Sequence, residues 1–322
     1  MGTIEVVGLG ALNMDNIYRV ERILDDGEAV VAGPVSSPGG SAANTIYGLA
    51  RLGVRTGFAG VVGKDNEGKM LLRDFAQAGV DTSQVRLKGQ ARTGSVLCLS
   101  DSLGRRSLYV SPGANSLLTR EDINLDYINQ AEMLHVSSFA DDRQFTVLLE
   151  LIGRLAPSVR LSFAPGSLYA PRGLSALAPI LAKTYALFIN QSEIQRLTGQ
   201  EDVPAATESC LRHGCQIVVV TLGQGAGWKN TRATAYVRDL THQYVIEPVR
   251  AGPISVSDTT GAGDAFAAGF LYGLLKGKGL DECGRLGDIV ARFSITKIGA
   301  RQGLPTIDEL SLCYRDLYNR EL

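Results

Sequence analysis

The sequence has few cysteines, almost no net charge and no long apolar run, and each of these absences excludes a class of protein. Its 322 residues include 32 Lys and Arg against 33 Asp and Glu, so we expect no basic surface for nucleic acid or anionic lipid. No apolar run approaches the roughly 20 residues that span a bilayer. The first residues lack the charged and apolar regions of a secretory signal. We therefore expect a cytoplasmic protein that binds neither nucleic acid nor a membrane.

The cysteines form a sparse and odd-numbered set, which argues against a disulfide framework and favours a reducing compartment. Cys210, His213 and Cys215 lie close together and could suggest a metal site. No second cluster of Cys and His supplies the remaining ligands, so a helix that ends before the strand at 216–221 is the favoured interpretation. The five cysteines are Cys98, Cys210, Cys215, Cys283 and Cys313.

Short apolar runs alternate with amphipathic stretches through most of the chain. With 45% hydrophobic and 20% charged residues, the composition is that of a folded domain and excludes a disordered chain. Alternating strands and helices predict an α/β fold with a mostly parallel sheet covered on both faces. The expected strands are 4–9, 56–62, 133–137, 159–163, 185–189 and 217–222, and the expected helices are 41–52, 65–78, 143–155, 191–197, 261–275 and 281–298.

Two stretches interrupt this alternation, Ile17 to Val35 and Ser95 to Val110. They contain strand-like runs with polar interruptions and no helix between them. We interpret them as antiparallel strands outside the main sheet that form a lid. The expected organisation is one domain over residues 1–322, with the lid formed by segments of about 13–37 and 92–112.

The most informative segment is Ser257 to Phe270, where a turn rich in glycine leads directly into an apolar helix. The backbone N–H groups of Gly261, Ala262 and Gly263 would be unpaired there and could bind an anion, aided by the helix dipole. Asp264 follows in the first turn, where a carboxylate could accept a proton from an attacking hydroxyl. An aspartate that only favours the start of a helix is the alternative.

At this point the sequence strongly resembles the ribokinase-like family of carbohydrate and nucleoside kinases. The segment from Asp258 to Asp264 matches the C-terminal signature of that family, and Pro38 to Asn44 matches its N-terminal signature. Further landmarks between the two signatures are 63–68, 112–115, 190–193 and 221–225. The resemblance implies a three-layer α/β/α sandwich with a mostly parallel sheet and a small β-sheet lid.

The resemblance also implies a role for each matching position. Asp264 would be the catalytic base, beside an anion hole at Gly261, Ala262 and Gly263. The acceptor sugar would bind at Asn13, Asp15, Gly39, Gly40 and Asn44. ATP would bind at Asn190, Glu193, Thr221, Gly223, Gly225, Gly299 and Ala300. Glu193 would organise Mg²⁺ indirectly, and Asp258 with the Thr260 backbone would hold a K⁺-like ion.

Several alternatives stay open at these positions. Asn44 could be a surface residue on a helix and Gly39-Gly40 only a turn, while Asn190 and Glu193 could form a helix cap. The expected reaction transfers the γ-phosphate of ATP to a primary hydroxyl of a ribose- or fructose-like sugar. A nucleoside such as adenosine is the alternative acceptor, and a catalytically silent sugar-binding regulator is a third hypothesis. A homodimer formed through the lid is also expected.

Two other nucleotide-binding motifs are excluded by spacing. The run from Gly8 to Asn13 comes after the first strand like a dinucleotide fingerprint, but Asn13 replaces the third glycine. The residues after Asn13 are predicted to form a strand and not a helix. No glycine-rich loop ending in Gly-Lys-Ser or Gly-Lys-Thr occurs, so the chain is not a P-loop nucleotidase.

Overall fold

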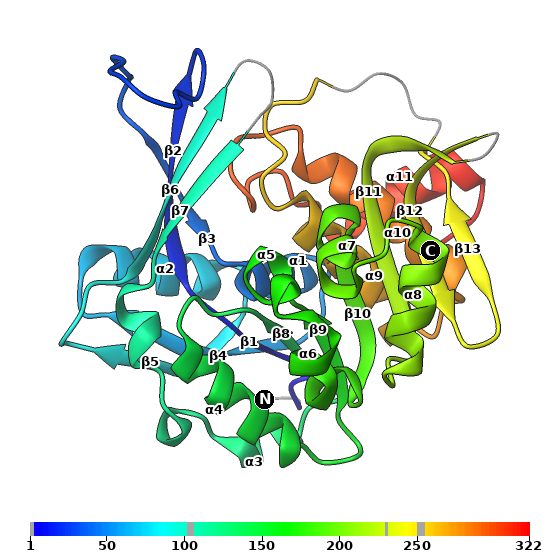
Figure 1. Ribbon diagram of the computed structural model, residues 1–322, viewed down its shortest axis with the longest axis horizontal. Coiled ribbons are helices and arrows are strands. Elements are labelled where there is room, and N and C mark those ends of the chain that lie inside the picture. Colours follow the sequence, from blue (N-terminus) through cyan, green and yellow to red (C-terminus); the bar gives the residue numbers. More distant parts are fainter. Residues whose placement is uncertain (1–2, 102–105, 229–230, 250–254) are drawn as a thin grey trace.

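A nine-stranded sheet forms the centre of the molecule (Figure 1). The computed structural model describes residues 3–101, 106–228, 231–249 and 255–322. The strand order is β13-β12-β11-β10-β9-β8-β1-β4-β5, with β12 and β13 antiparallel at one edge and the other neighbours parallel. The strands are β1 (Val6–Leu9), β4 (Thr56–Gly63), β5 (Asp81–Lys88), β8 (Met133–Ser137), β9 (Arg160–Ala164), β10 (Thr184–Asn190), β11 (Ile217–Trp228), β12 (Thr231–Asp239) and β13 (Gln243–Ile246).

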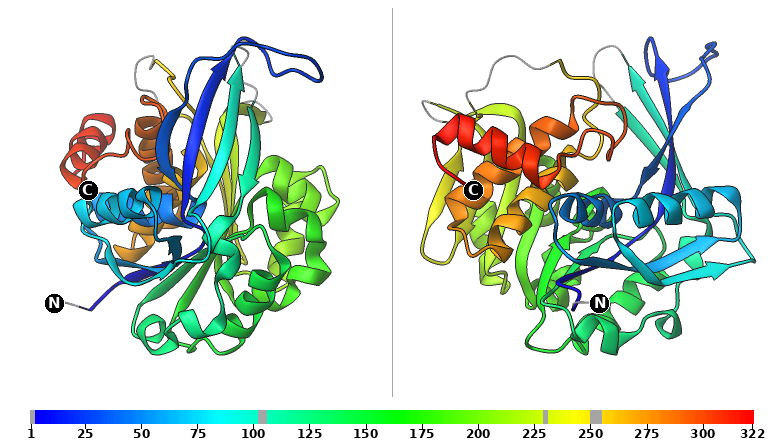
Figure 2. Two further views of the ribbon diagram at one scale, coloured as in Figure 1. Left: turned by 90° about the vertical axis from the view of Figure 1, so that its left-hand side faces the viewer. Right: turned by 180° about the vertical axis from the view of Figure 1, so that it is seen from behind.

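Helices cover both faces of this sheet, as the alternating pattern predicts. Strands β1, β4 and β8 are buried along their whole length because both of their faces are covered. One apolar cluster includes Phe75, Phe270 and Leu286, and a second on the opposite face includes Leu148 and Tyr169. The two layers are seen edge-on in the left panel of Figure 2.

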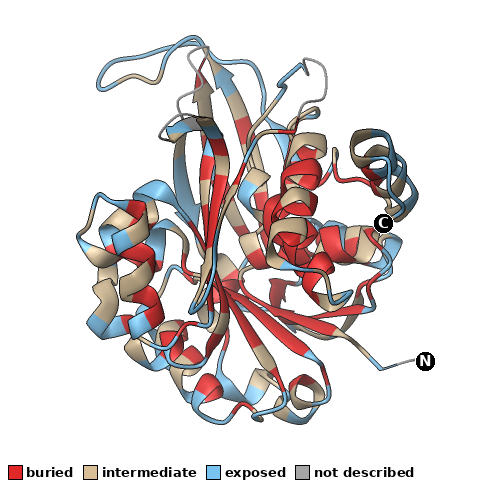
Figure 3. Cartoon of the chain, turned by 90° about the vertical axis from the view of Figure 1, so that its right-hand side faces the viewer, coloured by how far each residue is buried: buried red, intermediate tan, exposed pale blue. Residues whose placement is uncertain are grey.

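The helices divide between these two layers. The first layer contains α1 (Ser41–Arg51), α2 (Asn66–Gln77), α9 (Ala262–Leu275), α10 (Leu280–Ser294) and α11 (Ile307–Tyr318). The second contains α3 (Leu125–Asn129), α4 (Asp142–Gly153), α5 (Gly166–Tyr169), α6 (Gly173–Leu181), α7 (Gln191–Thr198) and α8 (Val203–Arg212). Figure 3 shows the buried residues concentrated in the sheet and in the helix faces that meet it. No helix in the described ranges is both long and apolar enough to cross a membrane.

A separate four-stranded sheet projects from one end of the main sheet (Figures 1 and 2). Its order is β3-β2-β6-β7, with bounds β2 (Asn13–Val20), β3 (Val35–Gly39), β6 (Gly94–Asp101) and β7 (Arg106–Ser111). The expectation of purely antiparallel strands was wrong, because β2 pairs with β6 in parallel. Most of the stretch between β2 and β3 is irregular, and residues 102–105 of the second expected stretch lie outside the described residues.

The C-terminal third differs from the prediction in β12 and β13, which were not among the expected strands, and in two of its helices. Helix α10 ends at Ser294 and not at 298, because the carbonyl of Ile295 accepts hydrogen bonds from the backbone N–H groups of Ser257 and Asp258. Helix α11 was not predicted. It begins with a capping box in which the side chains of Thr306 and Glu309 satisfy each other's backbone N–H groups.

Candidate active site

Asp264 lies at the start of α9 and accepts two hydrogen bonds from α1. Its Oδ1 accepts from Ser41 Oγ at 2.7 Å, and its Oδ2 accepts from Asn44 Nδ2 at 2.9 Å. The hydroxyl of Thr45 donates to the backbone carbonyl of Asp264 at 3.3 Å. Because Asn44 is buried against Asp264, the alternative in which it is a surface residue is wrong.

Close packing of α1 and α9 makes these contacts possible. One turn beyond Asn44, a Cβ on Gly48 would lie 2.8 Å from the Cβ of Ala268, which is one turn beyond Asp264. Only a residue without a side chain allows the two helices to approach this closely. The N-terminal turns of α1 and α9 are thereby held face to face.

Burial raises the pKa of Asp264 to about 6, since a low-dielectric environment disfavours the charged form. The hydrogen bonds from Asn44 and Ser41 lower this pKa, the charge of Glu193 raises it, and Arg301 lowers it. A carboxyl group with this pKa is ionised at neutral pH and is still basic enough to take a proton.

Asp15 lies on β2 beside Gly39 of β3. A Cβ on Gly39 would be 2.2 Å from Oδ2 of Asp15, so glycine is needed for the carboxylate to lie there. Oδ1 of Asp15 is buried and has no hydrogen-bond partner among the described atoms. Burial raises the pKa of Asp15 to about 7, and Arg301 opposes this while Asp264 and Asp258 add to it. An unpaired buried carboxylate oxygen destabilises the free protein. A hydroxyl group of a bound ligand could supply the missing hydrogen bond.

Asn13 begins β2 and is held by Asn115. The Asn13 Oδ1 accepts from Asn115 Nδ2 at 2.9 Å, while Asn115 also bonds the backbone N–H and carbonyl of Leu12. Gly40 has a φ of 104°, and a Cβ there would lie 2.1 Å from the carbonyl oxygen of Ala11. The Gly39-Gly40 pair therefore does more than form a turn, since it allows β3 and the start of β2 to meet below α1.

The turn before α9 is built around Asp258. Its Oδ1 accepts from the backbone N–H and hydroxyl of Thr260, and its Oδ2 accepts from the Gly299 N–H at 2.9 Å. Gly261 has a φ of 75°, and a Cβ there would lie 2.4 Å from the Cβ of Ala300. These contacts bring the predicted anion hole together with the predicted 299–300 segment.

Gly263 differs from Gly39, Gly40 and Gly261 because no neighbouring protein atom would clash with a side chain there. A Cβ at Gly263 would meet nothing within 4 Å, and its backbone φ is not positive. Gly261 is the N-cap of α9, and no side chain caps this helix. An exposed first turn with open space over a glycine allows an anion to approach the helix N-terminus closely.

Asn190 is the last residue of β10, and the predicted nucleotide residues Thr221, Gly223 and Gly225 lie in the middle of β11. Asn190 and Thr221 are register partners there, and Gly223 and Gly225 come next with φ values of 74° and 96°. Asn190 and Glu193 form a capping box at the start of α7, as the capping alternative predicts. Burial also raises the pKa of Glu193. In parallel α/β sheets, ligands bind at the carboxyl ends of the strands.

The comparison with known proteins agrees with this arrangement. Residues 3–307 match the family described as pfkB family carbohydrate kinase. The chain belongs to the pfkB family of carbohydrate kinases. It is therefore a sugar kinase, a phosphotransferase that acts on an alcohol group, and the three-layer fold with a small additional sheet is confirmed.

Relatives and solved structures extend the match over nearly the whole chain. An uncharacterized sugar kinase from Archaeoglobus fulgidus is 39% identical over 80% of this chain and 98% of its own length. The ATP-dependent ribose-1-phosphate kinase of Halopiger xanaduensis is 30% identical over 96% and 97%. The crystal structure of adenosine kinase from Sinorhizobium meliloti has a TM-score of 0.82 at 24% identity, with 98% and 99% covered.

Several residues of this pfkB kinase site were missed or given no role by sequence reasoning. Ser41 bonds Asp264, Asn115 holds Asn13, and Arg301 bonds Asn44. Ser41 lies inside the N-terminal signature and Asn115 inside a landmark, so their positions were signalled but their partners were not. A pairwise contact across more than 100 residues leaves no trace in local spacing.

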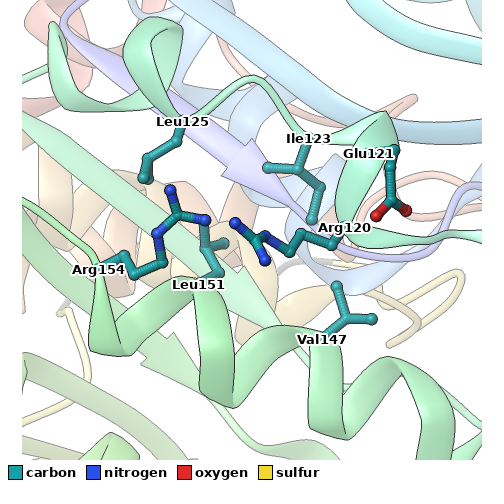
Figure 4. A pocket seen from close by; sticks show the side chains of 7 residues that line it. All are labelled: Arg120, Glu121, Ile123, Leu125, Val147, Leu151 and Arg154. Carbon is teal, nitrogen blue, oxygen red and sulfur yellow. The ribbon is translucent and has the colours of Figure 1, made fainter.

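Features away from this site do not contribute to it. Cys210 and Cys215 are buried, and α8 ends at Arg212 as the structural interpretation predicts. Among the described residues, no group of three or more His, Cys, Asp or Glu could hold a metal ion. A hollow of about 410 Å³ lies between α4 and residues 120–125, and the side chains of Arg120 and Arg154 point toward each other there (Figure 4). None of its lining residues belongs to the predicted site.

Proposed function

We propose that this kinase transfers the γ-phosphate of ATP to a primary hydroxyl of a ribose- or fructose-like sugar, with Asp264 as the general base. The observation that carries the proposal is Asp264 itself, held by Ser41 and Asn44 in the first turn of a helix whose N-terminus is open above Gly263. A base and an anion site therefore adjoin within one helical turn, as in-line phosphoryl transfer requires.

In this mechanism Asp264 accepts the proton of the acceptor hydroxyl as that oxygen attacks the γ-phosphorus. The N–H groups of Gly261, Ala262 and Gly263 stabilise the charge that develops on the transferring group. Asp15, Asn13 and Asn44 orient the acceptor by hydrogen bonds to its other hydroxyls.

Mg²⁺ bound with ATP would neutralise phosphate charge. Asn190 and Glu193 would hold it through water, since carboxylate and amide oxygens are the ligands that Mg²⁺ prefers. One oxygen of Glu193 accepts from the backbone of Asn190, so this pair has a fixed orientation. The half-buried carboxylate of Glu193, whose pKa is raised by burial, would be favoured in its ionised form by the positive charge of Mg²⁺.

The small sheet supports a role as a lid that excludes water. From β2, Arg19 Nη2 donates to the carbonyl of Ser257 at 3.1 Å, just before Asp258. This contact links the small sheet to the turn of the anion hole. Closure of such an element over the acceptor would prevent hydrolysis of ATP.

The acceptor is identified by steady-state turnover of ATP against ribose, fructose, ribose 1-phosphate and adenosine. Adenosine is included because the adenosine kinase from Sinorhizobium meliloti shares the fold of this chain. The highest kcat/KM with a free sugar supports the proposal, while preference for adenosine makes the chain a nucleoside kinase. No turnover with any acceptor, together with sugar binding, would support the silent regulator.

A K⁺-like ion at Asp258 should raise activity. Asp258 ties Thr260 to Gly299, so a hard cation bound by its carboxylate and the Thr260 carbonyl would fix the anion-hole turn. We expect kcat to fall several-fold when K⁺ is replaced by a bulky organic cation at constant ionic strength. In Asp258→Ala the two salts should give equal rates; equal rates in the unmodified enzyme would remove the ion from the mechanism.

The lid also supports a homodimer. On β6, Val96 and Cys98 are buried, whereas Leu97 faces outward next to its register partner Tyr109 of β7, which is 60% exposed. A second copy of the lid would cover this apolar pair. We expect a dimer in sedimentation equilibrium and a monomer for Tyr109→Asp; a dimer that persists in this variant would place the interface elsewhere.

We also assign the enzyme to the cytoplasm. Cys210, Cys215, Cys283 and Cys313 are free thiols, and the first three are buried. This fits a compartment in which thiols stay reduced. Fractionation of cells that express the tagged protein would test the assignment.

A further inference from the structure

Arg301 comes directly after the 299–300 segment and is one of the most buried charged residues of the described chain. Its side chain is 1% exposed and lies between two aromatic rings, 5.4 Å from the centroid of Tyr47 and 4.9 Å from that of Phe75. A buried guanidinium is costly unless its N–H groups are satisfied. Its partners therefore indicate why a charge is placed here.

The guanidinium bonds three different elements. Nη1 pairs with Oδ2 of Asp74 on α2 at 2.6 Å, Nη2 donates to the carbonyl of Gly39 at 3.0 Å, and Nε donates to Oδ1 of Asn44 at 2.9 Å. Asp74 supplies the opposite charge. The other two partners are Gly39, which is a predicted acceptor-binding residue, and Asn44, which bonds Asp264.

The bond from Arg301 determines which way the Asn44 amide points. With Oδ1 turned toward Arg301, Nδ2 must face Asp264, and it donates to that carboxylate at 2.9 Å. A flipped amide would set its oxygen against the carboxylate and its NH₂ group against the guanidinium, and both contacts would be repulsive. The orientation of Asn44 is thus fixed from both ends.

We propose that Arg301 is a positioning residue for phosphoryl transfer, which acts through Asn44 to hold the Asp264 carboxylate in place and ionised. This inference rests on the proposed role of Asp264 as the base. It adds a residue outside both sequence signatures.

The charges around Asp264 explain why such a residue is needed. Glu193 from α7 and Asp15 from β2 are negative and disfavour a further negative charge on Asp264. Arg301 opposes both, since its charge lowers the pKa of Asp264 and that of Asp15. Without it, burial and like charges would leave the base protonated nearer to neutral pH.

The test is the pH dependence of kcat/KM in Arg301→Lys and Arg301→Gln. Activity requires both Asp264 and Asp15 to be ionised, so kcat/KM rises with pH through the range in which this pair titrates. Losing the guanidinium should move this rise upward by about one pH unit in the Gln variant, and less in the Lys variant. A residue with only a structural role would lower kcat/KM equally at every pH; that result would overturn the proposal. Asp74→Asn is the matched control, because it removes the opposite charge of the half-buried Asp74 but keeps the Arg301 to Asn44 bond.

A double-mutant cycle with Asn44→Ala keeps the proposal testable if Arg301→Gln fails to fold. Arg301→Lys keeps the charge but loses the Nε donor, so it should lower kcat/KM about tenfold in the wild-type background and hardly at all beside Asn44→Ala. Additive losses would overturn the proposal. Asp264→Asn distinguishes failure of the base assignment from failure of the positioning role. Near-normal turnover in that variant refutes Asp264 as the base. Loss of turnover in that variant, together with additive effects of Arg301→Lys and Asn44→Ala, refutes only the positioning role of Arg301.

Discussion

Replacing Asp264 by Asn should reduce kcat by about 10²- to 10⁴-fold, the usual cost of losing a general base. The substitution preserves the size of the side chain but removes the proton acceptor. ATP should bind as well as before or more tightly, because one negative charge near the γ-phosphate is lost. The measurement is kcat from steady-state turnover, together with the Kd of ATP from calorimetry.

Ser41→Ala provides the matched control. It removes one of the two hydrogen bonds to Asp264 and leaves the carboxylate and the Asn44 bond intact. We expect a much smaller loss of kcat than in Asp264→Asn. Near-normal turnover in Asp264→Asn, or equal losses in the two variants, would show that the proton goes elsewhere.

The pH dependence of activity is set by the two raised pKa values. Burial raises the pKa of Asp264 to about 6 and that of Asp15 to about 7, and both groups must be ionised for the proposed mechanism. Activity should therefore fall as the pH falls through this range. Because the two carboxyls influence each other, the acid limb belongs to the pair and not to either residue alone. A rate that is flat between pH 8 and pH 5 would contradict this assignment.

Much of the fold could be predicted from sequence because its strands and helices carry strong local patterns. The strand at 133–137 coincides with β8, and the helix at 41–52 differs from α1 by one residue. The parallel pairing of β2 with β6 could not be predicted, because register and direction depend on partners far along the chain. The end of α10 was misplaced because a distant backbone segment bonds the carbonyl of Ile295, directly after the helix.

The residues of the candidate site could be predicted from the sequence, but the hydrogen bonds that connect them could not. The two signatures indicated Asp264 and Asn44, and the structure joins them by a hydrogen bond. Nothing in the spacing indicated that Asn44 serves two residues, accepting from Arg301 and donating to Asp264. That arrangement depends on three segments that meet only in the folded chain.

Replacing Asp15 by Ala should lower kcat/KM for the acceptor by tens-fold or more and leave the KM of ATP nearly unchanged. Its unpaired buried oxygen can be satisfied by a sugar hydroxyl, so a deoxy analogue should be strongly disfavoured by the unmodified enzyme. Asn44→Ala should also lower kcat/KM for the acceptor. Its effect should be less than additive with that of Asp15→Ala if both residues bind the same acceptor molecule. Since Asn44 also bonds Asp264, its loss should reduce kcat as well as acceptor binding.

Asp15→Asn separates a binding role from a structural one. Burial raises the pKa of Asp15 to about 7 in the folded protein, above its pKa in the unfolded chain. The protonated carboxyl therefore contributes fully to stability at pH values below the unfolded pKa, and this contribution is lost as the pH rises through 7. The neutral amide avoids that loss, so the Tm of Asp15→Asn should exceed that of the unmodified enzyme at pH 8, with a smaller difference at pH 5. Acceptor kcat/KM should nevertheless fall, because an NH₂ group, which only donates, replaces one of the two carboxylate oxygens that accept from hydroxyls. If kcat/KM is unchanged in both Asp15 variants, the acceptor binds elsewhere; if it falls only in step with a lower Tm, Asp15 supports the fold and not the substrate.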